Sequence, residues 1–173
     1  MTNREPFMNH FRAGNSLARL AIAASLAVSF CATAAHAKPK VRVITETFTV
    51  DATTLPGLLM QLQQKGPKGF WAYTDWYVSW TGSCETSARI TYTLPRHKNI
   101  YALNLVLRRK WLAMIKALEA HEHKHGQNAI NAAEEIEKTN CADGYAVIKK
   151  WNKADVDLDK RTRHGKLEGV GLK

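Results

Sequence analysis

The sequence predicts one α+β domain, in which a small, mainly antiparallel sheet packs against a long helix and a second, C-terminal helix. Three stretches, residues 41–50, 70–81 and 84–94, alternate in polarity and are rich in β-branched and aromatic side chains, as strands are. Residues 100–138 and 145–162 carry apolar side chains at helical spacing instead. Together these patterns predict about three strands and two main helices.

The first 37 residues have the pattern of a signal peptide. Three arginines precede an apolar run over residues 20–35, and Ala-His-Ala follows just before the expected cleavage after Ala37. An uncleaved membrane anchor is the alternative, but it needs about 20 apolar residues and this run is shorter. We therefore expect residues 38–173 to form a single mature domain in the periplasm or outside the cell.

Charge and cysteine content narrow the possible partners. The chain has a net charge of +10, but its basic residues are spread without a nucleic-acid-binding signature. We expect no nucleic-acid partner, and a possible weak association with anionic envelope surfaces. Cleavage would leave Cys84 and Cys141. Two cysteines in an oxidising compartment predict a disulfide, with two free thiols as the alternative.

Each element of the first half has local signals. Residues 51–54 offer N-caps for a short helix over residues 56–64, and the Lys-Gly-Pro-Lys-Gly run that follows is typical of a loop. The aromatic stretch 70–81 and the stretch 84–94 are expected to pair as a hairpin. Clustered aromatic residues are more often core than ligand platform, although a substrate groove stays open as an interpretation. His97 is expected to be an exposed loop residue.

The long helix contains the pattern H-E-x-x-H, formed by His121, Glu122 and His125. Positions four apart lie one turn above each other, so both imidazoles can reach one metal ion. Glu122 lies about 100° further round the axis, where it can act as a general base on a water at the metal. A solvated helix face is the alternative for an isolated H-E-x-x-H.

The surrounding periodicity favours the metal site. One continuous stripe at helical spacing contains Leu107, Trp111, Met114, Leu118, His121, His125, Ala129, Ala132 and Ile136. The histidines are therefore expected on the buried face. A buried histidine pair without a metal would need hydrogen-bond partners of its own, whereas one metal ion satisfies both rings.

A catalytic zinc site needs a third protein ligand besides a position for water. Glu134 and Glu135 lie too far along the same helix to fold back to the ion. The candidates on the returning helix and at its end are Asp155, Asp157, Asp159 and His164. His164 can reach the ion from that end, and the acids stay open as alternatives.

Several motifs extend along nearly all of residues 38–173. They are W-A-Y-T-D-W-Y-V-S-W at residues 71–80, Cys84, Leu94-Pro95, Trp111 ten residues before His121, and D-x-x-T-x-H-G at residues 159–165. These motifs resemble a bacterial family of predicted secreted zinc-dependent proteases, an HExxH metallopeptidase-like domain of unknown function. The resemblance implies zinc held by His121, His125 and His164, with Glu122 as the catalytic acid and base.

Two positions of the closing motif carry further expectations. The family usually has a tyrosine before the aspartate, and Leu158 stands there in this chain, so no tyrosine role is assigned to it. Asp159 is expected either to orient a ligating histidine through a hydrogen bond or to be a surface acid.

The resulting expectation is an exported zinc metallopeptidase that hydrolyses a peptide or protein substrate. Zinc would bind a water in its open position, and Glu122 would remove a proton from that water. The alternative is a secreted, non-catalytic zinc-binding or zinc-stabilised domain of the cell envelope. A fourth protein ligand in a closed site, such as Asp157 or Asp159, would select that alternative.

Overall fold

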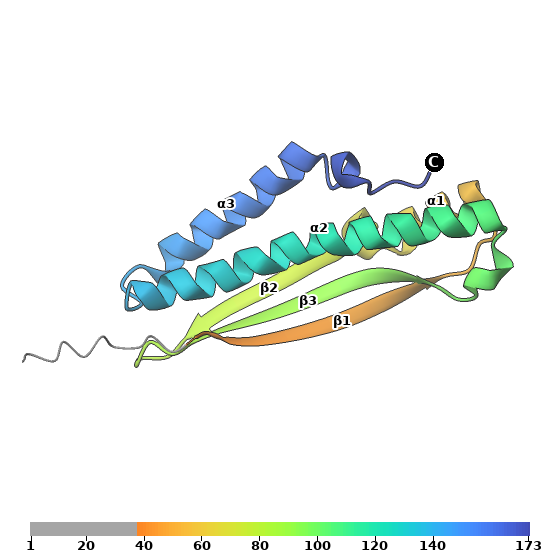
Figure 1. Cartoon of the computed structure of the whole chain (residues 1–173). Helices are drawn as coiled ribbons and strands as arrows, with labels where there is room; N and C mark the ends of the chain where they lie inside the picture. Colours follow the sequence, from red (N-terminus) through yellow and green to blue (C-terminus); the bar gives the residue numbers. More distant parts are fainter. Residues whose placement is uncertain (1–37) are drawn as a thin grey trace, which may run out of the picture. The chain divides into compact units, whose positions relative to one another are not determined.

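The structure is a computed structural model that describes residues 38–173; the expected signal peptide, residues 1–37, lies outside the described residues. The main elements are β1 (Lys40–Val50), α1 (Leu55–Lys65), β2 (Tyr73–Trp80), β3 (Thr86–His97), α2 (Leu105–Lys138) and α3 (Gly144–Thr162) (Figure 1). Short 3₁₀ helices are η1 (Pro67–Gly69), η2 (Ile100–Ala102) and η3 (Lys166–Glu168). The predicted α+β class is confirmed, and each predicted main element is present.

The three strands form one sheet in the order β1-β3-β2. β2 and β3 pair antiparallel, as expected for a hairpin, whereas β1 pairs with β3 in parallel along its whole length. The sheet is therefore mixed rather than mainly antiparallel. The cause is α1, which carries the chain from the end of β1 to the opposite edge, so that β3 returns through the middle in the direction of β1.

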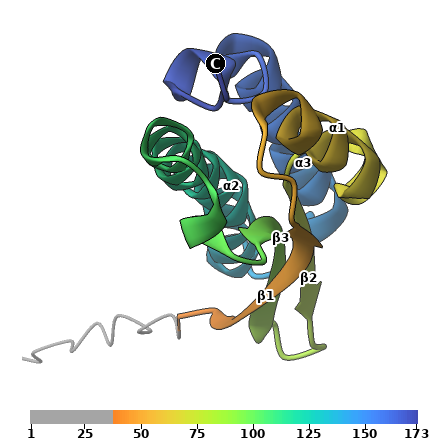
Figure 2. The same ribbon diagram turned by 90° about the vertical axis from the view of Figure 1, so that its right-hand side faces the viewer.

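Helix α2 packs on the sheet, and α3 returns along α2 on the same side (Figures 1 and 2). Every member of the predicted apolar stripe of α2 is buried, both histidines included. The residue directly after His125 is a glycine, Gly126, because the Tyr92 ring fills the space that a side chain would need. A Cβ at this position would lie 2.0 Å from the Tyr92 hydroxyl oxygen. None of the described helices combines the length and hydrophobicity that a bilayer crossing requires.

A disulfide joins Cys84, just before β3, to Cys141, in the turn between α2 and α3, with a sulfur–sulfur distance of 2.02 Å. The prediction of this bridge is confirmed. It lies beside an apolar cluster of Val78, Ala88, Ala132, Ala133, Ile136 and Val147. The end of α2 is thus held against the sheet by a covalent bond and by apolar packing.

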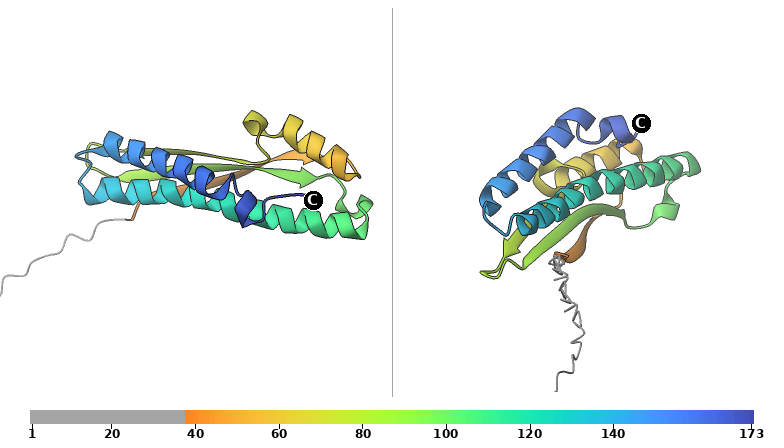
Figure 3. Two further views of the ribbon diagram at one scale, coloured as in Figure 1. Left: turned by 90° about the horizontal axis from the view of Figure 1, so that it is seen from above. Right: turned by 60° about the vertical axis from the view of Figure 1, so that its left-hand side comes forward.

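After α3 the chain forms η3 and then a coil that packs back onto the core. Arg163, His164 and Gly165 all have positive φ, and this tight turn sends the chain back beside α2 (Figure 3). Val170 and Leu172 are buried in the main apolar cluster. The turn therefore makes this segment part of the core.

His97 is buried rather than exposed as expected. β3 extends to His97, and its Nε2 lies 3.0 Å from the Ala52 carbonyl oxygen.

Candidate metal centre

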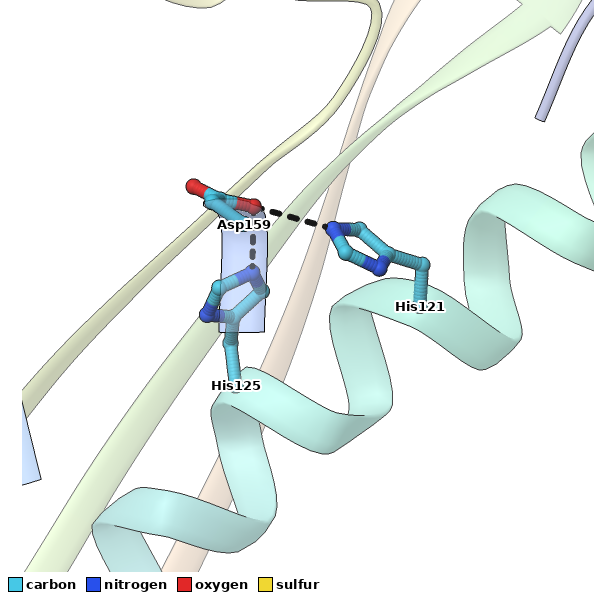
Figure 4. A group of neighbouring side chains, drawn as sticks. All are labelled: His121, His125 and Asp159. Carbon is cyan, nitrogen blue, oxygen red and sulfur yellow. Dashed lines mark hydrogen bonds and ion pairs between the residues drawn. The ribbon is translucent and has the colours of Figure 1, made fainter. Parts of the chain in front are cut away.

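Two histidines of α2 and one aspartate of α3 bring potential ligand atoms together (Figure 4). Nε2 of His121 lies 3.1 Å, and Nε2 of His125 lies 3.3 Å, from the same oxygen, Oδ1 of Asp159. Ligand atoms about 2.0 to 2.2 Å from a tetrahedral zinc ion are roughly 3.3 to 3.6 Å apart. Both nitrogen–oxygen separations are therefore close to one edge of such a tetrahedron.

Each histidine ring is also held from its other side by a carboxylate. Nδ1 of His121 lies 3.0 Å from Oε2 of Glu168, and Nδ1 of His125 lies 2.9 Å from Oδ1 of Asp155. A carboxylate at Nδ1 favours the tautomer that carries its proton there and leaves the lone pair on Nε2. Metal-ligating histidines are oriented in this way in proteins.

This arrangement supplies a test of whether a metal ion fits. With Nδ1 protonated, both Nε2 lone pairs face Asp159, and an ionised carboxylate can only accept hydrogen bonds. Acceptors that face each other in a buried place are unfavourable unless protons or a cation lie between them. Two imidazoles and a carboxylate form a donor set that suits zinc. The residues present therefore fit a divalent metal ion.

The electrostatics of the cluster also favour a bound cation. Burial lowers the pKa of His125, but the hydrogen bond to Asp155 and the charges of Asp155, Asp159 and Glu122 outweigh burial and raise it. The same concentration of negative charge attracts a cation. Protonation of the rings and metal binding are thus competing ways to neutralise one site.

Further hydrogen bonds tie these carboxylates to several elements. Asp155 accepts from the Asn128 amide at 2.7 Å and from the Trp76 indole N–H, in β2, at 2.6 Å. Glu168 accepts from the Lys124 ammonium at 2.6 Å. The sheet, both long helices and the C-terminal turn therefore all contribute to the orientation of the two imidazoles.

Glu122 is buried beside the cluster, with 6% of its surface exposed. Its Oε2 accepts a hydrogen bond of 2.6 Å from the Thr74 hydroxyl in β2. Burial raises the pKa of Glu122, and the hydrogen bond from Thr74 and the neighbouring histidines offset this only in part. A carboxyl group with a raised pKa beside a metal site is suited to take and return a proton near neutral pH.

The cluster opens into a cavity of about 1090 Å³. His121, Glu122, His125 and Asp159 line one part of it, and residues 70–76 and 169–173 line much of the rest. This volume is slightly above that of typical small-molecule sites. The potential metal position therefore lies at a cavity rather than in a sealed core.

His164, expected as the third ligand, lies beside the cluster. Its Nδ1 is 3.3 Å from Oδ2 of Asp159, the oxygen that the other two rings do not face, and its side chain is 57% exposed. The geometry favours Asp159 over His164 as the third ligand. Asp157 instead pairs with Lys153. The reason is helical spacing: positions 155 and 159 share the face of α3 that meets α2, and position 157 does not.

Comparison with known protein families shows the family to which the chain belongs. A family model described as "Bacterial protein of unknown function (DUF922)" matches residues 45–165, which is well over half of the chain. The chain belongs to the DUF922 family. The DUF922 match includes α2, α3 and the turn up to Gly165, and so it contains all three potential ligands. No curated protein and no solved structure matches the chain.

Several residues of the site were not singled out from the sequence. Asp155 was named from the sequence only as a candidate ligand, and its contact with Nδ1 of His125 was not predicted, although Asp155 lies one turn before Asp159 on the returning helix. Glu168 gave none: it follows the DUF922 match in a glycine-rich segment, and it reaches His121 only through the left-handed turn at residues 163–165. Thr74 and Trp76 could be assigned to a strand, but their contacts with the site depend on how α2 and α3 cross the sheet.

Proposed function

We propose that this protein is an exported, periplasmic or secreted, zinc-dependent metallopeptidase that hydrolyses peptide bonds in a peptide or protein substrate. His121, His125 and Asp159 would hold the zinc ion, and Glu122 would act as general base. The observation that supports the proposal is that the buried Glu122 carboxyl group, whose pKa burial raises, lies beside three potential metal ligands at a cavity. When bound, zinc would polarise the substrate carbonyl and make a water easier to deprotonate.

Glu122 has the features that the proton transfers require. Oε2 is engaged by Thr74, which leaves Oε1 to accept the proton of the attacking water. Because burial favours the neutral carboxyl group, the proton can stay on Glu122 until the leaving amine needs it. Glu122 then passes the proton to the amide nitrogen as the carbon–nitrogen bond breaks.

The free edge of β2 favours a peptide chain as substrate. β2 is an edge strand of the sheet. Every residue from 70 to 76 lines the cavity, whereas a strand that presented only one face to the cavity would contribute every second residue. Within residues 38–173, the backbone of β2 pairs only with β3, so alternate N–H and C=O groups point outward without a strand partner. An extended peptide can add to such an edge.

A non-catalytic, zinc-stabilised domain is the alternative function, and it would need a closed site. In the part of the chain that the structure describes, the cluster has three protein ligand atoms and adjoins the cavity. A tetrahedral ion held by three ligands keeps one position for water or substrate, as in catalytic zinc sites. The geometry therefore supports the enzyme over the structural zinc site.

The test compares wild type with Glu122→Gln, both expressed as the full chain so that export determines the purified form. Zinc-loaded proteins are incubated with a peptide library from a digested bacterial proteome, and new termini are identified by mass spectrometry. Glu122→Gln should keep one zinc per chain and lose about 100- to 10,000-fold in cleavage rate, because the base is gone.

Glu119→Gln is the matched control. Glu119 lies on α2 and is exposed, so this variant should cleave like wild type. The proposal fails if zinc-loaded wild type produces no new termini, or if Glu122→Gln cleaves as fast as wild type. Amino-terminal sequencing of the exported protein also tests the expected start at Lys38.

A further inference from the structure

The sheet has a second open edge besides that of β2. β1 lies on the other side of β3 and pairs with it in one unbroken register (Figure 1). Within residues 38–173, the other polar contacts of β1 lie at its ends, where Lys40 pairs with Glu85 and Lys65 donates to the Thr49 carbonyl. The outward N–H and C=O groups of residues 41–48 are therefore available to another strand.

β1 lacks several features that usually protect such an edge. Protected edge strands are commonly short, interrupted by proline or bent by a bulge. β1 is long and regular instead, and it exposes Val41 and Val43, with 44% and 54% of their surfaces accessible. Its charged side chains, Lys40, Arg42 and Glu46, are of both signs. The edge of β1 is therefore suited to a partner strand with matching charges.

The charges of β1 indicate which strand would fit. Arg42 lies directly beside Arg89 of β3, on the face of the sheet that α2 does not cover. Like charges on neighbouring strands are unfavourable, so a carboxylate on the open side of Arg42 would stabilise this pair. Glu46 lies on the same face of β1. Within residues 38–173, neither Arg42 nor Glu46 forms an ion pair.

We propose that the open edge of β1 binds β1 of a second copy of this chain, in antiparallel pairing about a two-fold axis at Ile44. In this register, Arg42 of each copy lies opposite Glu46 of the other, because both positions are two residues from the axis. The axis repeats the ion pair, and each carboxylate meets an Arg42–Arg89 pair. The two three-stranded sheets then form one continuous sheet.

Other antiparallel registers fit the charges of β1 less well. An axis at Arg42 or at Glu46 would place two like charges opposite each other. An axis at Val43 would place Glu46 opposite Lys40, which already has an acidic partner in its own chain. An axis at Ile44 also pairs more residues of β1 than an axis at Val43, because Ile44 is nearer the middle of the strand.

This interface leaves the candidate metal centre open. β1 and β2 are opposite edges of the sheet, and no residue of β1 lines the cavity of about 1090 Å³. The pairing of two copies therefore does not depend on the proposed metallopeptidase function. A peptide could still add to the edge of β2 in each copy.

The experiment is sedimentation equilibrium on the exported protein, expressed as the full chain. Wild type should form dimers. Arg42→Glu and Glu46→Arg should each raise the dissociation constant about tenfold or more, because each places like charges opposite each other twice. The double variant should regain the dimer. An equimolar mixture of the two single variants should form heterodimers, because opposite charges again face each other.

Lys149→Glu is the matched control, because it makes the same change of charge at an exposed position of α3. It should dimerise like wild type. The register is tested by oxidative cross-linking. Ile44→Cys should link two copies readily, since directly opposite Cα atoms in antiparallel strands lie about 4.5 to 5.5 Å apart, within reach of a disulfide. Glu46→Cys should link much more slowly, because position 46 does not lie opposite itself.

Several results would overturn the proposal. They are a wild type that sediments only as a monomer, single variants that dimerise like wild type, a mixture that forms no heterodimer, and a Lys149→Glu variant weakened as much as Arg42→Glu. Faster linking of Glu46→Cys than of Ile44→Cys would also overturn it. If a single variant fails to fold, the double variant and the cross-linking of Ile44→Cys still decide the outcome.

Discussion

Two regions of helix α2 contact the rest of the fold by opposite physical means. Near its C-terminal end, Ala132, Ala133 and Ile136 pack against Val78 and neighbouring apolar side chains beside the disulfide. Earlier on the helix, within the same buried stripe, His121 and His125 contact the carboxylates of Asp155, Asp159 and Glu168, which approach from α3 and η3.

This difference between the two regions of α2 predicts that one mainly stabilises the fold and the other mainly binds the metal ion. Apolar burial and a disulfide need no further component to hold the helix. The two Nε2 atoms and Oδ1 of Asp159, which face one another, are instead satisfied together only when a cation or protons lie between them. We therefore expect changes at the disulfide end to alter the free energy of unfolding, and changes in the polar cluster to alter metal binding.

The largest expected effect follows from removing Asp159, the proposed third ligand. Asp159→Ala should lower zinc affinity by at least about 100-fold, because it removes a charged ligand that two imidazoles face. Competition with a chromophoric chelator measures the affinity, with Asp157→Ala as the matched control on the same helix. Near-normal zinc affinity in Asp159→Ala would show that the polar cluster does not hold the metal through this residue.

Hydrogen exchange on the same variant sharpens the comparison. In Asp159→Ala, residues 155–168 should lose protection from exchange because the proposed metal ion would no longer join them to α2. The apolar cluster around Ile136 should keep its protection. Equal loss at both places would contradict the separation of the two regions.

A smaller effect is expected from removing the disulfide at the C-terminal end of α2. The double variant Cys84→Ser and Cys141→Ser should lower the free energy of unfolding by about 4 kcal/mol, because the disulfide closes a long loop in the unfolded chain. Urea titration of the zinc-loaded protein measures this change. Zinc affinity of the folded variant should match wild type, and a clear loss of zinc affinity would show that the two regions are coupled.

The smallest effect concerns the pH dependence of hydrolysis. As the proposed general base, Glu122 would act only when ionised, so the rate of the proposed hydrolysis would fall as pH drops through the pKa of Glu122. The hydrogen bond from Thr74 lowers this pKa against the effect of burial. Thr74→Val should therefore raise the pKa further and move the acid limb of kcat/KM to higher pH.

A pH series on the cleaved peptide measures this limb, with Thr91→Val on the opposite face of the sheet as control. A shift to lower pH in Thr74→Val would contradict the assignment of the limb to Glu122.

The register of α2 and the disulfide were predictable because each depends on simple rules. Helical periodicity is local, so the buried stripe, including His121 and His125, could be read directly and is confirmed. The remaining two cysteines of the expected mature chain left one pairing to predict, and it is present. The direction of β1 was missed because strand pairing depends on the route of the α1 crossover, which has no local pattern.

By itself, the sequence determined which helix carries the H-E-x-x-H pattern and which face of that helix is buried. Only the tertiary structure shows that Asp159 faces both rings while His164 lies beside Asp159, and that Asp155 and Glu168 hold the two rings. The contacts of the two rings join residues 30 to 47 positions apart. They depend on how α3 crosses α2 and on the left-handed turn after it, and neither is encoded in a spacing along one helix.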